Sequence, residues 1–236
     1  MYKDKYVNAI ITAAGSGSRM GIGITKQFLK VGKMTVLERT IRKIIKSKYI
    51  DKIVLVIRKD EEKDISELLK SIKSNKTITL TFGGDSREES TFNGIKAIDK
   101  NTDIVLMHDG ARPFIKTQLI DEMIEATDLH RAIICAVPAK DTIKIITHDM
   151  KVKSTPERSR LYMVQTPQIF DYELILKAYQ SVEYNSPKIT DDSSLIEAIG
   201  EEVFVHSGDY NNIKITTDED LILANILAQE EDNEDR

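Results

Sequence analysis

The amino-acid sequence predicts an α/β fold built on a mostly parallel sheet with helices on both faces. Short apolar runs alternate with amphipathic stretches along most of the 236 residues. The apolar runs are continuous rather than alternating, which is typical of strands buried on both faces. The length suffices for one domain with a sizeable core, and no internal repeat or linker divides the chain. We therefore expect a single α/β domain.

Strands and helices alternate in the first part of the chain. The predicted strands are residues 6–12, 52–57, 78–82, 103–107 and 132–137, and the predicted helices are residues 36–45, 60–72, 86–98 and 117–129. Ser86 is followed three residues later by Glu89, which is the spacing of a capping box. Thr117 is the expected cap of the fourth helix.

The pattern changes after residue 137. Residues 141–147 and 150–154, separated by the turn His148-Asp149, predict a β-hairpin. A two-stranded arm is marginal alone, so we expect this arm, about 139–160, to protrude into a second subunit. The remaining predicted elements are a return to the sheet at 161–165, helices at 171–181 and 190–199, strands at 203–206 and 212–216, and a last helix capped by Thr217.

Composition restricts the class of partner. The formal net charge is −4, and residues 230–236 alone contain five acidic residues and one Arg. The body, residues 1–229, is therefore balanced and offers no general attraction to nucleic acid. We expect the acidic end, 230–236, to be disordered and solvated.

No membrane span or signal peptide is predicted. The single cysteine, Cys135, lies in an apolar run that suits a buried strand. A reducing, cytoplasmic location is the expectation.

The loop after the first predicted strand carries the strongest functional signal. Small residues from Ala13 to Ser18 let a ligand approach the main chain, and Arg19 and Lys26 add positive charge. The loop lacks the Gly-Lys pair of a Walker loop and the third Gly of a dinucleotide fingerprint. An ordinary strand-to-helix turn would explain the glycines alone, but the two cations favour a site for a nucleotide triphosphate.

Further polar residues fall at predicted strand ends. They are Asp85, Ser90, Asp109, Arg112, Arg158, Thr166, Thr190 and Lys214. Cations and hydroxyls predominate, without a nucleophile triad or zinc-binding cysteines, which argues against acyl transfer and favours phosphoryl chemistry. Asp109 after a buried strand can hold a ribose hydroxyl or a metal ion, although a satisfied loop Asp is the commoner case. We interpret His108 as structural.

Six motifs resemble sugar-phosphate nucleotidyltransferases, and more narrowly the 2-C-methyl-D-erythritol 4-phosphate cytidylyltransferase family of non-mevalonate isoprenoid biosynthesis. The motifs are residues 13–20 with Lys26-Gln27-Phe28, 83–90, 108–113, 138–144, 165–168 with Phe170, and 212–216. The resemblance covers nearly the whole chain and implies a Rossmann-like fold, a homodimer joined through the hairpin arm, and Mg²⁺. The implied reaction joins CTP and methylerythritol phosphate and releases pyrophosphate.

The resemblance also implies residue roles. Four residues would be catalytic: Arg19 and Lys26 at the α-phosphate, and Arg158 and Lys214 at the acceptor phosphate. The nucleotide would be bound by Ala13, Ala14, Gly15, Gly84, Asp85, Ser90 and Gly110. The acceptor side would be formed by Asp109, Arg112, Thr142, Thr166 and Thr190, with Asp109 also the candidate metal ligand. Thr142 and Arg158 flank the arm and are candidates to act across the dimer.

Three alternatives stay open from the sequence. Ribitol-5-phosphate cytidylyltransferase shares the nucleotide half, although residues 137–144 and the Glu89-Ser90 pair look more like the methylerythritol family. A nucleotide-binding oxidoreductase is disfavoured by the missing third glycine. A non-catalytic nucleotide sensor would bind CTP without turnover, but the full set of cations gives no sign of lost chemistry.

Overall fold

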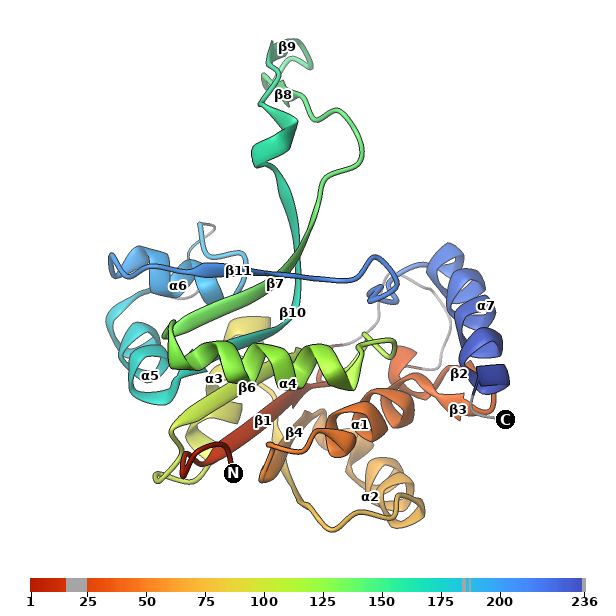
Figure 1. Ribbon diagram of the computed structural model, residues 1–236. Helices are drawn as coiled ribbons and strands as arrows, with labels where there is room; N and C mark the ends of the chain where they lie inside the picture. The colour runs from red at the N-terminus through yellow and green to blue at the C-terminus, as the bar shows by residue number, and fades with distance from the viewer. Residues whose placement is uncertain (16–24, 184–185, 187, 235–236) are drawn as a thin grey trace.

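A seven-stranded sheet forms the centre of the protein (Figure 1). The computed structural model describes residues 1–15, 25–183, 186 and 188–234. The strand order is β11-β7-β10-β6-β1-β4-β5. The bounds are β1 Val7–Thr12, β4 Lys52–Ile57, β5 Thr77–Phe82, β6 Ile104–Asp109, β7 Ala132–Pro138, β10 Tyr162–Asp171 and β11 Phe204–Ser207. Only β10 runs antiparallel to its neighbours, so the predicted mostly parallel sheet is confirmed.

Helices cover both faces of this sheet. They are α1 Val36–Lys46, α2 Glu62–Ser71, α3 Arg87–Ala97, α4 Thr117–Glu125, α5 Tyr172–Ser181 and α6 Asp192–Ala198, whereas α7 Asp218–Glu234 packs beside α1. Ile11 packs in one hydrophobic cluster with residues of α1 and α4, whereas Ile10 packs in a second cluster with residues of α3, α5 and α6. The inner strands β1, β4 and β6 thus bury both of their faces, which explains their continuous apolar runs. Among the described residues, no helix is both long and apolar enough to cross a membrane.

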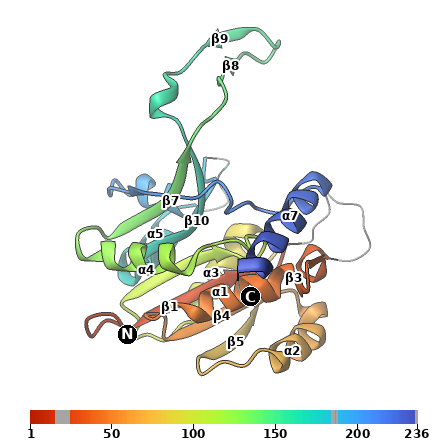
Figure 2. The same ribbon diagram turned by 45° about the vertical axis from the view of Figure 1, so that its right-hand side comes forward.

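The arm between β7 and β10 projects away from the sheet (Figures 1 and 2). Its two short strands, β8 Ile145–Ile146 and β9 Val152–Ser154, pair in antiparallel fashion, so the predicted hairpin is confirmed. The pairing is shorter than expected from the sequence. Ile145, Ile146 and Val152 are about half exposed or more, at 47%, 48% and 61%. These apolar side chains are therefore only partly covered by other residues of this chain.

The structure differs from the sequence expectations at two local points. The N-cap of α4 is Lys116 rather than Thr117, whose hydroxyl instead donates to the carbonyl of Lys43 on α1 at 3.0 Å. A short hairpin that the sequence did not reveal, β2 Lys30–Val31 and β3 Met34–Thr35, precedes α1 and turns at Gly32, which has a φ of +62°.

Residues 212–216 were expected to form a strand, and this prediction is wrong. Their backbone has no strand neighbour and is held by isolated hydrogen bonds. The N–H of Ile215 donates to the carbonyl of Ala111 at 2.9 Å, and Arg112 Nη1 donates to the carbonyl of Asn212 at 2.8 Å. Ile215 is fully buried beneath α7, in a cluster with Phe114 and Leu227. The alternation of the sequence reflects this packing rather than a sheet.

As far as Glu234, the chain differs from the expectation of a disordered tail at 230–236, whose last two residues lie outside the described part. Helix α7 continues through Glu234. Glu231 lies 2.9 Å from Arg39 and 2.8 Å from Lys43, both on α1, and the Arg39 side chain is only 4% exposed. The acidic residues near the end therefore balance a buried cation, which holds the last turns of the helix against α1.

Candidate active site

A cavity of about 560 Å³ lies at the carboxyl ends of the parallel strands. This is the edge where open α/β sheets bind ligands. Most of the lining residues lie at or just after the ends of β1, β4, β5 and β6. The others are residues 26–27 and a residue of the segment before α7. The full set of lining residues is Thr12, Ala13, Ala14, Gly15, Lys26, Gln27, Arg58, Gly84, Asp85, Ser86, Arg87, Ser90, Asp109, Ala111 and Lys214.

Gln27 holds the loop that follows β1. It lies on the short 3-10 helix Lys26–Phe28 and is buried. Its Nε2 donates to the carbonyls of Ala13 and Gly15, the latter at 3.3 Å. Ala13, Ala14, Gly15 and Lys26 all line the cavity. Arg19 lies outside the described residues.

The loop between β5 and α3 forms a second wall. Ser90 Oγ accepts from the N–H of Gly84 at 3.0 Å and donates to the carbonyl of Ser86 at 2.8 Å. The N–H of Asp85 donates to Glu89 Oε2 at 2.8 Å. The two loops also touch, because a Cβ atom at Gly83 would lie only 2.5 Å from the Cβ of Ala14. Gly84, Asp85 and Ser90 therefore face the cavity, and Ser90 fixes the shape of the turn.

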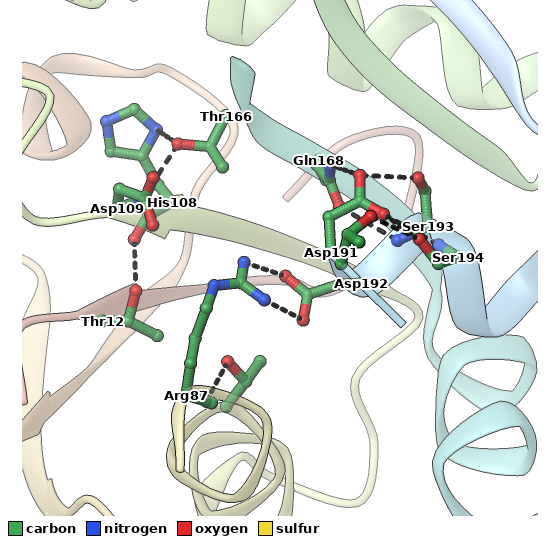
Figure 3. Close-up of polar contacts among 12 residues, drawn as sticks. Thr12, Arg87, His108, Asp109, Thr166, Gln168, Asp191, Asp192, Ser193 and Ser194 are labelled. Carbon is green, nitrogen blue, oxygen red and sulfur yellow. Dashed lines mark hydrogen bonds and ion pairs between the residues drawn. The ribbon is translucent and has the colours of Figure 1, made fainter. Parts of the chain in front are cut away.

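Asp109 ends β6 and is the centre of charge in the cavity. Its Oδ2 lies 2.9 Å from Lys214 Nζ and 3.3 Å from Arg112 Nε. Burial by itself raises the pKa of this carboxyl, but the positive charges of Lys214, Arg112 and Arg87 outweigh burial and hold the pKa well below its usual value. Asp109 is therefore ionised at neutral pH. Its N–H donates to Thr166 Oγ1 at 3.0 Å, which ties β6 to β10 (Figure 3).

His108 lies beside this group but faces the interior. Its Nδ1 is 3.2 Å from Thr166 Oγ1 and its Nε2 is 3.2 Å from the carbonyl of Arg112. Burial lowers the pKa of His108 to about 4. The ring is therefore neutral at neutral pH, and both of its nitrogens have partners. This arrangement fits the structural role that we expected.

The N-terminal end of α6 lies outside the lining of the cavity and is fixed to β10. Thr190 is exposed there, with its Oγ1 3.4 Å from Ser194 Oγ. The following residue, Asp191, accepts from Gln168 Nε2 at 2.7 Å, and the N–H of Ser193 donates to Gln168 Oε1 at 3.1 Å (Figure 3). The buried Gln168 thus fixes this end of α6 to β10. It belongs to the motif at 165–168, but the resemblance implied no site role for it.

Six predicted site residues that the structure describes do not line the cavity: Gly110, Arg112, Thr142, Arg158, Thr166 and Thr190. Thr142 and Arg158 lie exposed on the arm, where Arg158 Nη1 donates to the carbonyl of Lys140 at 3.1 Å. Gly110 donates its N–H to the carbonyl of Thr12 at 2.9 Å and accepts from Thr40 Oγ1 at 2.9 Å, so its backbone groups are already used. Arg112 reaches the site only through Asp109.

Six cavity residues were not predicted as site residues: Thr12, Gln27, Arg58, Ser86, Arg87 and Ala111. Gln27, Ser86, Arg87 and Ala111 belong to the motifs given above, but the resemblance implied no site role for them. Arg58 directly follows β4. The rule that ligands meet the carboxyl ends of parallel strands is a signal that could have identified Arg58.

The fold and the site together define a nucleotide-binding α/β enzyme of the nucleotidyltransferase class. A loop of small residues with a nearby Lys lies at the carboxyl edge of the sheet, opposite an Asp–Lys–Arg cluster. The chain belongs to the family IspD, 2-C-methyl-D-erythritol 4-phosphate cytidylyltransferase, which it matches over residues 7–230. The resemblance inferred from the sequence motifs is therefore confirmed.

Several relatives are similar over nearly their whole length. The chain is 43% identical over 228 residues to the 2-C-methyl-D-erythritol 4-phosphate cytidylyltransferase of Clostridioides difficile, covering 96% of each chain. The 4-diphosphocytidyl-2C-methyl-D-erythritol synthase of Anaerococcus prevotii has a crystal structure that matches with a TM-score of 0.86 and 44% identity, covering 95% of this chain and 96% of that one. The Francisella tularensis enzyme matches with a TM-score of 0.78 and 32% identity, covering 94% and 99%.

Proposed function

We propose that the chain transfers a cytidylyl group from CTP to 2-C-methyl-D-erythritol 4-phosphate, forming 4-diphosphocytidyl-2-C-methyl-D-erythritol and pyrophosphate. Membership of the family supports this reaction. The structural observation that carries it is the cavity, which has a loop of small residues and Lys26 on one wall and the Asp109–Lys214 pair on another. Such a cavity can hold a triphosphate and an acceptor phosphate side by side.

The nucleotide takes the side of the cavity formed by the loops after β1 and β5. Ala13, Ala14 and Gly15 present backbone at the cavity surface, and Lys26 supplies positive charge for the phosphates. Arg19 acts with Lys26 in this proposal. The base is read by Gly84, Asp85 and the turn that Ser90 fixes, where main-chain groups and one short side chain can distinguish the amino group and carbonyl of cytosine.

The acceptor takes the side formed by Asp109, Lys214 and the start of α6. Lys214 orients the acceptor phosphate, an oxygen of which attacks the α-phosphorus of CTP. The bond from that phosphorus to the bridging oxygen of the β-phosphate breaks, and pyrophosphate leaves with the electron pair. A phosphate nucleophile is already ionised at neutral pH, so positioning and charge neutralisation suffice.

Magnesium fits the donor set. Mg²⁺ in proteins uses one or two carboxylates together with substrate phosphates and water. Lys214 and Arg112 both contact Oδ2 of Asp109, and within the described parts of the chain its Oδ1 makes no hydrogen bond. Those parts contain no group of three or more His, Cys, Asp or Glu side chains suited to a metal. We infer that Asp109 Oδ1 holds Mg²⁺ that arrives with CTP and neutralises phosphate charge.

The arm supports a homodimer in this proposal. Its exposed apolar residues need a partner surface, and Thr142 and Arg158 lie on the arm rather than in the cavity of their own chain. We infer that they complete the acceptor site of the neighbouring subunit.

A mixing experiment tests this inference with two variants, one with Arg158→Ala and the other with Lys214→Ala, each inactive alone. When the two variants are unfolded and refolded together, about a quarter of wild-type activity should return, because half of the subunits enter mixed dimers with one intact site. Continued inactivity would mean that Arg158 acts within its own chain.

The reaction is tested by supplying the protein with CTP, Mg²⁺ and either methylerythritol phosphate or ribitol 5-phosphate and following pyrophosphate release. We expect release with methylerythritol phosphate. Turnover of ribitol phosphate alone would assign the other acceptor. CTP binding without any turnover would indicate a sensor. The expected cytoplasmic location stays a prediction.

A further inference from the structure

Arg87, which lines the cavity, forms an ion pair with Asp192 at the start of α6. Arg87 is the first residue of α3 and directly follows the loop assigned to the base, whereas Asp192 is the first residue of α6, two residues after Thr190. Arg87 Nη2 lies 3.1 Å from Asp192 Oδ2, and Nη1 lies 3.5 Å from Oδ1 (Figure 3). The guanidinium thus contacts both carboxylate oxygens and links the start of α3 to the start of α6.

The carboxylate partner of Arg87 is held rigidly. The Asp192 side chain is only 3% exposed, and Tyr179 on α5 donates its hydroxyl to Asp192 Oδ1 at 2.7 Å. The Tyr179 ring stacks on Phe92 of α3, with ring centroids 5.2 Å apart. Asp192 is therefore fixed by α5 as well as by α3.

Arg87 also faces the cavity. Its side chain is 34% exposed, and it is one of the residues that line the cavity wall. It lies close enough to Asp109 for the two charges to stabilise each other. The pair therefore links a residue of the cavity wall to the end of α6 that follows Thr190.

We propose that Arg87 and Asp192 form a positioning pair for cytidylyl transfer. The pair keeps the Thr190 end of α6 at a fixed distance from the start of α3, so that the acceptor phosphate meets the α-phosphorus of CTP in line. A guanidinium is suited to this because its planar fork bridges two oxygens, which a lysine ammonium cannot do. A displacement of about 1 Å between reacting groups can cost about 10²-fold in rate. The inference rests on the proposed function.

The test compares Arg87→Lys and Asp192→Asn with wild type. Both variants remove the two-point contact while keeping the size of the side chain. We expect kcat/KM for methylerythritol phosphate to fall by about 10²-fold in each, while the Kd for CTP changes by less than about threefold, because the turn at Gly84 is held by Ser90 and Glu89. The double variant should be no worse than either single variant, since both remove one contact.

Arg131→Lys is the matched control. Arg131 Nη2 lies 2.9 Å from Asp171 Oδ1, which is the same kind of pair, but these residues do not line the cavity. This variant should keep wild-type kinetics. Thermal unfolding of every variant identifies any loss of structure, and Arg87→Lys, which retains the positive charge beside the buried Asp192, carries the test if Asp192→Asn does not fold.

Two results would overturn the inference. The first is a kcat/KM for the acceptor in Arg87→Lys that equals the wild-type value. The second is that CTP affinity and kcat/KM for the acceptor fall by the same factor, in step with the loss of thermal stability. Wild-type enzyme in the same assay tests the reaction itself. Absence of pyrophosphate release by wild type would contradict the proposed function, whereas normal wild-type turnover with unaffected variants would contradict only the role of the pair.

Discussion

Lys214 and Asp109 form an ion pair that joins the irregular segment before α7 to the end of β6, with Nζ 2.9 Å from Oδ2. The segment itself is held by the N–H of Ile215 on the carbonyl of Ala111 and by Arg112 on the carbonyl of Asn212. Lys214 therefore reaches the cavity from a backbone that hydrogen bonds and packing, rather than a sheet, keep in place.

Replacing Lys214 should damage use of the acceptor more than binding of CTP. In Lys214→Ala we expect kcat/KM for methylerythritol phosphate to fall by about 10²-fold, the scale for one preorganised charge, with the Kd for CTP nearly unchanged. Steady-state kinetics with both substrates and calorimetry with CTP measure the two effects. Lys48→Ala, which changes an exposed lysine paired with Glu125, should behave like wild type. A main effect on CTP binding would instead place Lys214 on the nucleotide side.

Lys26 should act on the transfer step. We expect Lys26→Ala to lower kcat by about 10²-fold or more, because the charge that develops at the α-phosphate loses a positioned cation. The same prediction holds for Arg19→Ala. Single-turnover measurement of pyrophosphate formation separates this effect from product release. The control is Lys30→Ala, on the exposed first residue of β2. A drop of only two- or threefold would mean that Lys26 is peripheral.

The buried His108 should make stability depend on pH. Burial lowers its pKa to about 4, against an ordinary value of 6.5. Between these values the unfolded state binds a proton that the native state does not, so the free energy of unfolding falls as the pH falls from about 6.5 to about 4. Over this whole pH range the free energy of unfolding falls by about 3 kcal/mol.

Urea denaturation with EDTA present, at several pH values in this range, measures the slope. His108→Gln should have a shallower slope than wild type. His148→Gln, which changes an exposed residue of the arm, should retain the wild-type slope. Equal slopes in wild type and His108→Gln would contradict a neutral, buried His108.

Cys135 should be unreactive in the native protein. Burial raises the pKa of its thiol to about 11, so at pH 8 only about one molecule in 10³ carries the reactive thiolate. A disulfide reagent at pH 8 should react at least about 10²-fold more slowly with native protein than with protein in concentrated urea. Rapid labelling of the native protein would show that the strand carrying Cys135 opens.

Periodicity predicted the sheet well because buried strands have a strong local signature. The predicted strand at 52–57 has the bounds of β4, and the other strands lie within two residues of their predicted positions, except β10, which continues six residues beyond the predicted 161–165. The segment at 212–216 shows the limit of this signal. An apolar residue at every second position indicates burial, but burial of Ile215 comes from α7 and not from a neighbouring strand.

The site was predictable where its residues cluster in the sequence. The loop at 13–15, Lys26 and the loop at 83–90 line one cavity, as the motifs indicated. The pair formed by Arg87 and Asp192 could not be recognised in the same way, because it joins two distant helix ends and each residue alone is ordinary for a first turn. Sequence spacing describes neighbours along the chain, whereas this contact depends on how α3 and α6 pack on the same face of the sheet.

The reversed direction of β10 has a geometric consequence. Strand β7 ends at the carboxyl edge of the sheet, and β10 begins there because it runs the opposite way. The arm between them therefore leaves the sheet and returns to it at the edge that holds the cavity. Had β10 run parallel to β7, the connecting chain would have had to cross the sheet and start the strand at the far end. One inverted strand is what brings the protruding hairpin and the chemistry to the same pole of the protein.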